Sequence, residues 1–179
     1  MISVLTPTVP ERGAMLVEAW RSVQEQTITS FEHLIHMDDL YEGCAVTMNR
    51  LAERAHGEWL LPLADDDLLL PDCLGAHLDG AATGADIIYS PPIVEGEAPD
   101  GFHGTPPRIP SLALIRTSLW RQLGGYEVTL GQCEDYDFYM RATGQGARFH
   151  RIEGGTWIYR FHGANKSRGH TFQHMPTPQ

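Results

Sequence analysis

The chain has 179 residues, of which 42% are hydrophobic, so it can build one packed domain with a sizeable core. Its net charge of −10 is uneven, because residues 1–140 hold 7 basic and 22 acidic side chains whereas residues 141–179 hold 6 basic and 1 acidic. The acidic body disfavours broad, sequence-independent binding to nucleic acid, which needs a basic surface.

The first half of the chain alternates predicted strands with predicted helices. Residues 2–5 are rich in β-branched and large apolar side chains, and the loop Thr6-Pro7-Thr8-Val9-Pro10 follows them. Apolar side chains then recur at helical spacing from residue 13 to residue 26. The further predicted strands are 31–37, 58–63 and 85–90, and the further predicted helices are 44–56 and 71–78.

The second half is less regular. Residues 91–110 contain six prolines and are predicted to form a long loop. Predicted strands follow at 112–115, 148–152 and 156–161, with predicted helices at 118–123 and 134–142. We expect a single domain over residues 1–165 and a mobile tail over residues 166–179. Trp20, Trp59 and Trp157 are predicted to lie in the core.

This order of elements predicts an α/β fold with a mostly parallel sheet flanked by helices on both faces. Ligands of such sheets gather at the carboxyl ends of the strands. Three polar clusters follow predicted strands at that edge: Thr6-Pro7-Thr8, Asp38-Asp39 and Asp65-Asp66-Asp67. The sequence therefore predicts one binding site assembled from all three.

The acidic triplet Asp65-Asp66-Asp67 is the most informative of these clusters. Apolar runs lie on both sides of it, so its carboxylates repel each other and lose solvation unless a positive group compensates them. Carboxylate oxygens at a strand end suit Mg²⁺ or Mn²⁺, which would in turn hold a phosphate-bearing ligand. The alternative is a solvated acidic turn.

The cysteines and the chain start indicate the compartment. Cys44, Cys73 and Cys133 are odd in number and contain no Cys-x-x-Cys pair, which argues against a disulfide framework or a zinc site. The N-terminus shows no basic segment before an apolar stretch, and no apolar run approaches the roughly 18–20 residues of a membrane span. We expect a cytoplasmic protein without a membrane span.

From residue 2 to about residue 167 the chain resembles the inverting family 2 glycosyltransferases, which have the GT-A fold. Besides the opening strand with its Pro-Thr loop, the paired acids and the DxD-type triplet, the resemblance rests on five segments in the family's order. They are Ser22-Val23-Gln24-Glu25-Gln26-Thr27, Ala55-His56-Gly57-Glu58-Trp59-Leu60, Leu123-Gly124-Gly125-Tyr126, Glu134-Asp135-x-Asp137 and Tyr159-Arg160-x-His162.

The resemblance implies transfer of a sugar from a nucleotide diphosphate donor to an acceptor hydroxyl. Asp66, then Asp67, would bind Mn²⁺ or Mg²⁺, and the cation would stabilise the leaving diphosphate. His162 maps to a histidine ligand of relatives, although a structural role is the alternative. Asp135 resembles the catalytic base. Asp137 is expected to point toward Arg141 instead.

The donor-binding residues follow from the same resemblance. The nucleotide base would lie against Pro7, Thr8 and the Val9 backbone. Asp39 or Asp38 would accept a hydrogen bond from the base, which favours UDP. Asp65 would contact the ribose. Arg160, Lys166 and Arg168 would close over the diphosphate, with solvated charges as the alternative. Asn49 would assist, with a helix-surface amide as the alternative. Glu134 and Trp120 are candidates to contact or support the acceptor. Val9-Pro10 replaces the family's usual aromatic-polar pair, and Ala64 replaces its first acid.

Two other functions compete with this one. A sugar-phosphate nucleotidyltransferase needs an early glycine-rich loop and lysine, but Lys166 is the single lysine of this chain. A non-catalytic nucleotide-sugar-binding module of the same fold is the other alternative. The sugar and the acceptor, whether glycan, lipid, protein or modified base, stay open, as does the oligomeric state.

Overall fold

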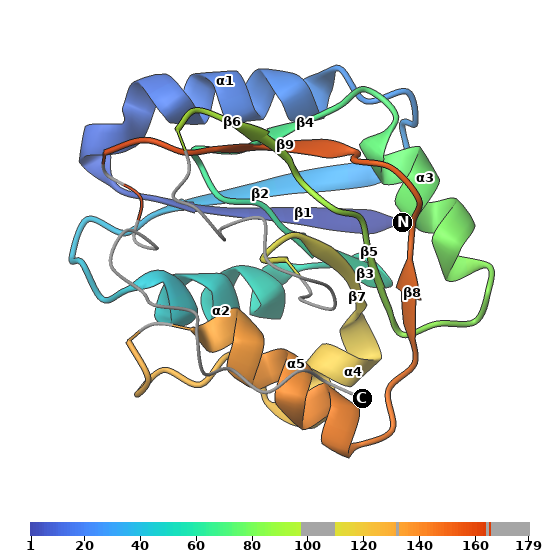
Figure 1. Cartoon of the computed structure of the whole chain (residues 1–179). Helices are drawn as coiled ribbons and strands as arrows, with labels where there is room; N and C mark the ends of the chain where they lie inside the picture. Colours follow the sequence, from blue (N-terminus) through green and yellow to red (C-terminus); the bar gives the residue numbers. More distant parts are fainter. Residues whose placement is uncertain (98–109, 132, 164, 166–179) are drawn as a thin grey trace.

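The computed structural model describes residues 1–97, 110–131, 133–163 and 165. A six-stranded sheet with strand order β2-β1-β3-β7-β5-β8 lies at its centre (Figure 1). Its strands are β1 (Ile2–Thr8), β2 (Phe31–Met37), β3 (Trp59–Pro62), β5 (Ile87–Tyr89), β7 (Ala113–Arg116) and β8 (Phe149–Arg151). Only β7 runs antiparallel to its neighbours in this sheet.

Helices cover both faces of this sheet (Figure 1). The helices are α1 (Gly13–Gln24), α2 (Cys44–Arg54), α3 (Cys73–Ala81), α4 (Thr117–Leu123) and α5 (Glu134–Gly144), and the 3-10 helix η1 (Pro10–Arg12) precedes α1. Successive strand residues face opposite sides, so Val4 packs in a cluster with Val23 of α1, and Leu5 packs in a cluster with Leu51 of α2 and Phe138 of α5. The predicted mixed α/β fold with a mostly parallel, helix-covered sheet is confirmed.

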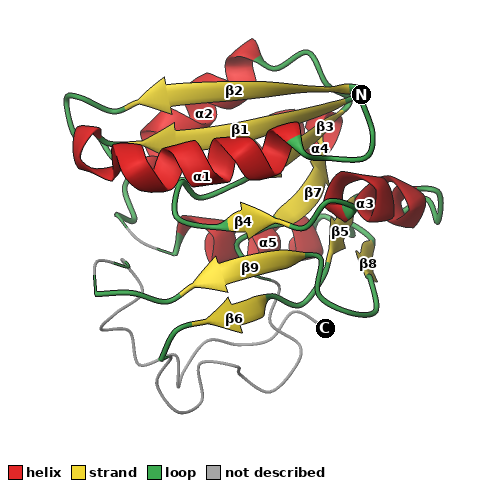
Figure 2. Ribbon diagram, turned by 90° about the horizontal axis from the view of Figure 1, so that it is seen from above, coloured by secondary structure: helices red, strands yellow, loops and turns green. Residues whose placement is uncertain are grey.

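A second sheet of three short strands was not predicted. It has the order β4-β9-β6, with β4 (Leu68–Leu69), β6 (Ile93–Glu95) and β9 (Trp157–Arg160) (Figure 2). β6 lies inside the segment 91–110 that was predicted to be a loop, so that prediction is wrong for its three residues. Residues 98–109 of the same segment lie outside the described residues, as does the predicted tail 166–179 with Lys166 and Arg168.

β1 also extends further than predicted, through the Thr6-Pro7-Thr8 segment. Proline lacks a backbone N–H and is tolerated in a strand only where no partner needs one. The C=O of Leu5 accepts the N–H of Leu63 at 2.9 Å, so the backbone polar groups of Leu5 face β3. Pro7 lies two residues further along β1, so its nitrogen faces the same side. β3 has already ended there, so pairing with β3 does not need an N–H from Pro7. The β2 side remains fully paired as far as Thr8 and Met37.

The boundaries of the other elements lie within three residues of the predicted ones. Trp59 and Trp157 are buried as predicted, but Trp20 is 45% exposed on α1, so its assignment to the core was wrong. Among the helices in the described part of the chain, none combines the length and apolar character needed to cross a bilayer.

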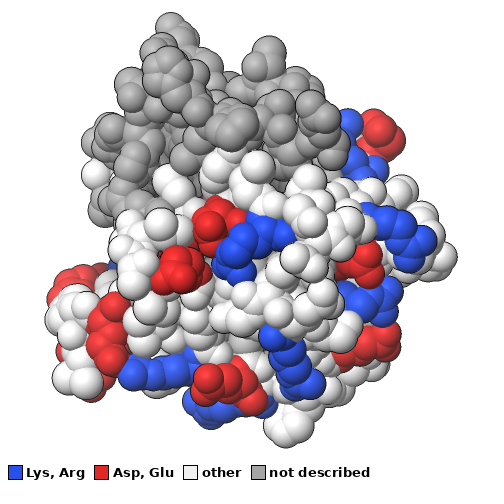
Figure 3. Space-filling model, turned by 90° about the horizontal axis from the view of Figure 1, so that it is seen from below, with Lys and Arg blue, Asp and Glu red and all other residues white. Residues whose placement is uncertain are grey.

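Charged side chains of both signs lie interspersed on the face seen in Figure 3. Elsewhere in the described chain, Arg50 pairs with Glu42, and Arg116 pairs with Glu58.

Candidate active site

A pocket of about 540 Å³ opens at the carboxyl ends of β1, β2 and β3. The structure brings the three predicted polar clusters together in it, along with the start of α5. The predicted site residues that line the pocket are Pro7, Thr8, Val9, Asp38, Asp65, Asp66, Asp67, Glu134 and Asp135.

The acidic triplet forms a tight turn directly after β3. All four β3 residues are buried between β1 and β7, and the N–H of Asp67 donates to the C=O of Ala64 at 3.2 Å. Asp65, Asp66 and Asp67 are 3%, 6% and 1% exposed, which rules out a solvated acidic turn. Carboxylates buried to this degree require compensating partners.

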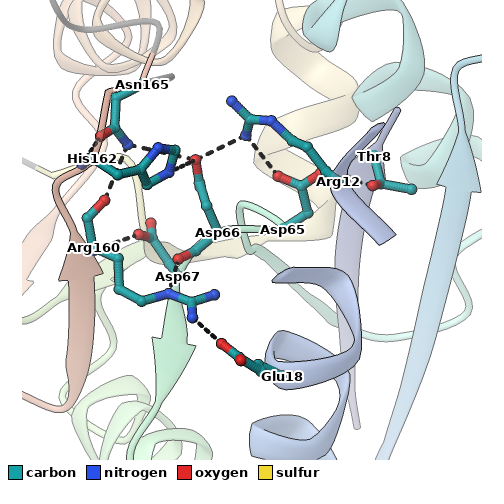
Figure 4. A network of polar contacts seen from close by, with 9 residues as sticks. All are labelled: Thr8, Arg12, Glu18, Asp65, Asp66, Asp67, Arg160, His162 and Asn165. Atoms are coloured by element: carbon teal, nitrogen blue, oxygen red, sulfur yellow. Dashed lines mark hydrogen bonds and ion pairs between the residues drawn. The ribbon is translucent and has the colours of Figure 1, made fainter. Parts of the chain in front are cut away.

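Arg12 supplies the positive partner that the triplet needs. Its Nη1 lies 2.8 Å from Oδ1 of Asp65 and 2.8 Å from Oδ2 of Asp66 (Figure 4). Thr8 at the end of β1 also donates to Oδ2 of Asp65 at 2.7 Å. One guanidinium therefore joins two carboxylates at the floor of the pocket.

Asp66 also meets the segment that follows β9. Its Oδ2 lies 3.2 Å from Nε2 of His162 and 3.5 Å from Nδ2 of Asn165 (Figure 4). The antiparallel pairing of Leu68 with Ile158 brings the triplet next to the end of β9. If this register is continued by two residues, position 66 lies opposite position 160.

A carboxylate oxygen suits Mn²⁺ or Mg²⁺, and an imidazole nitrogen beside it favours Mn²⁺, the softer of the two. Two adjacent ligands of an octahedral ion of this size lie about 3 Å apart, which the 3.2 Å between Asp66 and His162 matches. Within the described residues no group of three His, Cys, Asp or Glu side chains could hold a metal ion. Among the described residues, Asp66 and His162 are therefore a candidate pair of side-chain ligands for a cation, without a third from His, Cys, Asp or Glu.

Arg160 points away from the pocket, contrary to its predicted role over the diphosphate. Its guanidinium contacts Glu18 of α1 and the backbone C=O of Asp66 (Figure 4). Its backbone N–H donates to Oδ1 of Asp67 at 3.1 Å. Burial, together with the neighbouring charge of Asp66, raises the pKa of Asp67 well above its usual value. Arg160 thus fastens the triplet turn to β9 and α1.

Of the paired acids after β2, Asp38 lines the pocket and Asp39 is exposed outside it. The Asp38 carboxylate accepts the N–H of Glu42 at 2.9 Å and the N–H of Gly43 at 2.8 Å. Burial works to raise the pKa of Asp38, but these hydrogen bonds outweigh it and lower the pKa. An ionised Asp38 therefore organises the loop that leads into α2.

Asn49 and Trp120 have structural positions instead of the predicted contacts with ligands. Nδ2 of Asn49 donates to the backbone C=O of Tyr126, and Oδ1 of Asn49 accepts the backbone N–H of Tyr126, each at 2.9 Å. Trp120 is 4% exposed, and its ring centroid lies 4.6 Å from that of Tyr126 and 4.9 Å from that of Phe138. Core packing of these rings removes Trp120 from the surface where an acceptor would bind.

Asp135 lies half-buried in the first turn of α5, where it lines the pocket beside Glu134. Burial raises its pKa to about 6, although the N–H of Tyr136, 2.7 Å from Oδ1, works in the other direction. Asp137 pairs instead with Arg141 at 2.7 Å, as its spacing predicted.

The sequence reasoning missed several residues that line the pocket or contact the triplet, namely Arg12, Tyr41, Tyr126, Cys133 and Asn165. A signal existed for Arg12, because it is the single Lys or Arg among residues 1–20 and follows the first strand. Cys133 and Tyr41 have φ of 62° and 54°, in the left-handed region, and these are the two non-glycine residues of the described chain with positive φ. Such strain collects at functional sites.

Comparison with known proteins finds no matching family model and no matching curated protein. Solved structures do match. S. aureus TarS residues 1–349 in complex with UDP-GlcNAc superposes with a TM-score of 0.76 at 17% identity, covering 94% of this chain and 61% of that one. The complex of the same TarS piece with UDP gives a TM-score of 0.73 at 18% identity, covering 89% and 60%.

A mannosyltransferase from Pyrobaculum calidifontis, PcManGT in complex with GDP-Man and Mn²⁺, gives a TM-score of 0.66 at 15% identity, covering 88% of this chain and 56% of that one. The fold is therefore that of GT-A glycosyltransferases. The chain spans about 60% of the TarS piece that it matches.

Proposed function

We propose that this protein is an inverting, metal-dependent glycosyltransferase that moves a sugar from a nucleotide diphosphate donor, with UDP-sugars favoured, to an acceptor hydroxyl. Residues 1–165 form its single GT-A-like domain in this proposal. The observation that carries it is the buried triplet, which shares one pocket with Asp135 and meets His162 at Asp66. The proposed cation site and the proposed base would thus face the same cavity.

The donor nucleotide would lie along the carboxyl ends of β1 and β2. Pro7, Thr8 and Val9 would line the base, and Asp38, which is ionised and rigidly held, would set the shape of the loop beside it. Asp65 would accept a hydrogen bond from the ribose, since a carboxylate has about four acceptor sites and Thr8 and Arg12 fill only two.

Asp66 and His162 would hold Mn²⁺ or Mg²⁺, whereas Asp67 accepts the N–H of Arg160 and keeps the triplet turn in place beside them. When bound, the cation supplies Lewis-acid stabilisation of the charge that develops on the departing diphosphate. Arg12 forms ion pairs with Asp65 and Asp66. Once a cation and the ribose engage these carboxylates, the guanidinium could turn toward a phosphate oxygen. The pocket therefore holds cationic groups where negative charge would grow.

Asp135 would take the proton from the acceptor hydroxyl. A pKa raised to about 6 leaves it ionised at neutral pH and makes it a stronger proton acceptor than an ordinary carboxylate. Glu134, beside it at the pocket wall, would orient the acceptor. Attack from this side displaces the diphosphate from the opposite face of the sugar, which gives inversion.

The ligands of the similar structures support this proposal. TarS was solved with UDP and with UDP-GlcNAc, and PcManGT with GDP-Man and Mn²⁺. Nucleotide sugars and a divalent cation are therefore ligands of proteins that share this fold.

A thermal-shift panel of nucleotide sugars, each with and without Mn²⁺, tests the proposal. A ligand at a hundredfold excess over its Kd should raise the unfolding free energy by about 2.7 kcal/mol. We expect a UDP-sugar to do this only with Mn²⁺, and Asp66→Ala to abolish the shift. Stabilisation that is independent of the cation, or kept in Asp66→Ala, would contradict the metal assignment.

Product analysis separates the alternatives. Sugar transfer or slow donor hydrolysis supports the glycosyltransferase, and binding without either would favour a non-catalytic module. Pyrophosphate release from nucleoside triphosphates would indicate a nucleotidyltransferase, and we expect none because the sequence lacks the early glycine-rich loop and lysine of that class.

A further inference from the structure

Tyr41 lies at the rim of the pocket, in the loop between β2 and α2. It lines the same cavity as Val9 and Asp38, yet the residue is left 61% exposed. Large aromatic side chains gain much from burial, so a ring left open beside a binding pocket has a surface available for a ligand.

The backbone presents this ring at a conformational cost. Tyr41 has a φ of 54°, which is unfavourable for a residue with a side chain, and its N–H donates to the C=O of Asp38 at 3.4 Å. Asp38 in turn accepts the N–H groups of Glu42 and Gly43, which brace the loop on its other side. The loop geometry is thus fixed by a buried carboxylate beneath it.

A hydrogen bond across the pocket rim fixes the other end of the side chain. The hydroxyl of Tyr41 donates to Oε1 of Glu11 in η1 at 2.5 Å. The same bond lowers the pKa of Glu11, so its carboxylate is ionised and holds the ring at neutral pH. Tyr41 therefore bridges the loops that follow β1 and β2.

The other aromatic rings that line the pocket have partners within the described structure. The Tyr126 ring packs 4.6 Å from that of Trp120, and the Tyr159 ring lies 6.2 Å from that of Trp157. Val9, at the end of β1, brings no ring. Tyr41 is therefore the aromatic residue best placed to cover a planar ligand at the β1–β2 end.

We propose that Tyr41, positioned by Glu11, forms the stacking wall for the nucleobase of the donor. This inference rests on the proposed function. Stacking on an aromatic ring tolerates any base, so Tyr41 would contribute affinity for the nucleoside whereas the groups around Asp66 would bind the diphosphate.

Calorimetric titration of the whole chain with UDP, with GDP and with inorganic pyrophosphate, each in the presence of Mn²⁺, tests the proposal. Tyr41→Ala should weaken UDP binding by roughly 5- to 150-fold, the range measured for loss of one stacked base, and leave pyrophosphate binding within about twofold. Tyr41→Phe keeps the ring but loses the hydrogen bond to Glu11, so UDP affinity should fall clearly less than in Tyr41→Ala. Tyr41→Leu is the matched apolar control and should behave like Tyr41→Ala.

The outcomes separate this inference from the proposed function. Unchanged UDP affinity in Tyr41→Ala, or an equal loss in Tyr41→Phe, overturns the stacking role while the function stands. A parallel loss of pyrophosphate binding also overturns it, because the substitution would then have damaged the whole site. If the wild-type protein binds pyrophosphate but neither UDP nor GDP, the proposed function fails and the inference falls with it.

Discussion

Replacing Arg12 with glutamine removes the positive charge from the acidic triplet and keeps a hydrogen-bond donor. Nη1 of Arg12 lies 2.8 Å from a carboxylate oxygen of both Asp65 and Asp66, which are 3% and 6% exposed. Two unit charges about 4 Å apart at an effective dielectric near 20 interact by about 4 kcal/mol. The Arg12 side chain is 23% exposed, so solvent screens part of this energy. We expect Arg12→Gln to lower the unfolding free energy by about 2–4 kcal/mol at neutral pH.

The same substitution should strengthen binding of a metal ion. The guanidinium lies on the Asp66 oxygen that faces His162, where a cation would have to bind against its charge. Without nucleotide, we therefore expect Mn²⁺ to bind Arg12→Gln at least about tenfold more tightly than the wild-type protein. Titration of the electron paramagnetic resonance signal of free Mn²⁺ measures this affinity, and urea unfolding measures the stability.

Arg50→Gln is the matched control, because Arg50 pairs with Glu42 on the exposed surface and should change neither quantity much. Mn²⁺ at a hundredfold excess over its Kd should also restore about 2.7 kcal/mol to Arg12→Gln. If Arg12→Gln kept both the wild-type stability and the wild-type manganese affinity, Arg12 would not be the counter-ion of the triplet.

Three further predictions concern the base, the Asn49 bridge and a buried histidine. Asp135→Asn should lower turnover by roughly 10²–10⁴-fold while calorimetry finds donor affinity within about threefold, and wild-type turnover should halve as pH falls through about 6. Asn49→Ala should lower the unfolding free energy by about 1–3 kcal/mol in urea, with UDP affinity nearly unchanged, because it removes two hydrogen bonds to Tyr126. Burial lowers the pKa of His77 to about 4. Between about pH 7.5 and pH 4.5 the unfolded chain therefore binds a proton that the folded chain does not. Over this range the unfolding free energy of the wild type should fall by about 2–3 kcal/mol more than that of His77→Leu.

Each of these has an outcome that contradicts it. Retained turnover in Asp135→Asn would reject Asp135 as the base. A loss of UDP affinity in Asn49→Ala without a loss of stability would return Asn49 to the donor site. Equal pH dependence of stability in the wild type and His77→Leu would mean that His77 is not held neutral by burial.

The sequence by itself determined most of the main sheet and its helices. Hydrophobic periodicity is a local property, so the strand at residues 31–37 and the start of the helix at residue 134 coincide with the structure. The rule that ligands meet the carboxyl ends of parallel strands also placed Thr8, Asp38 and Asp66 in one pocket.

Only the tertiary structure decided the second sheet and the directions of the side chains. β4 has two residues, too few to show alternation, and it exists because Leu68 pairs with Ile158. That long-range pairing brings His162 to Asp66 and turns Arg160 away from the pocket. The choice of Arg12 as the partner of the triplet likewise depends on how two distant loops pack. Residue type indicates which charges need partners, but only packing selects the partner.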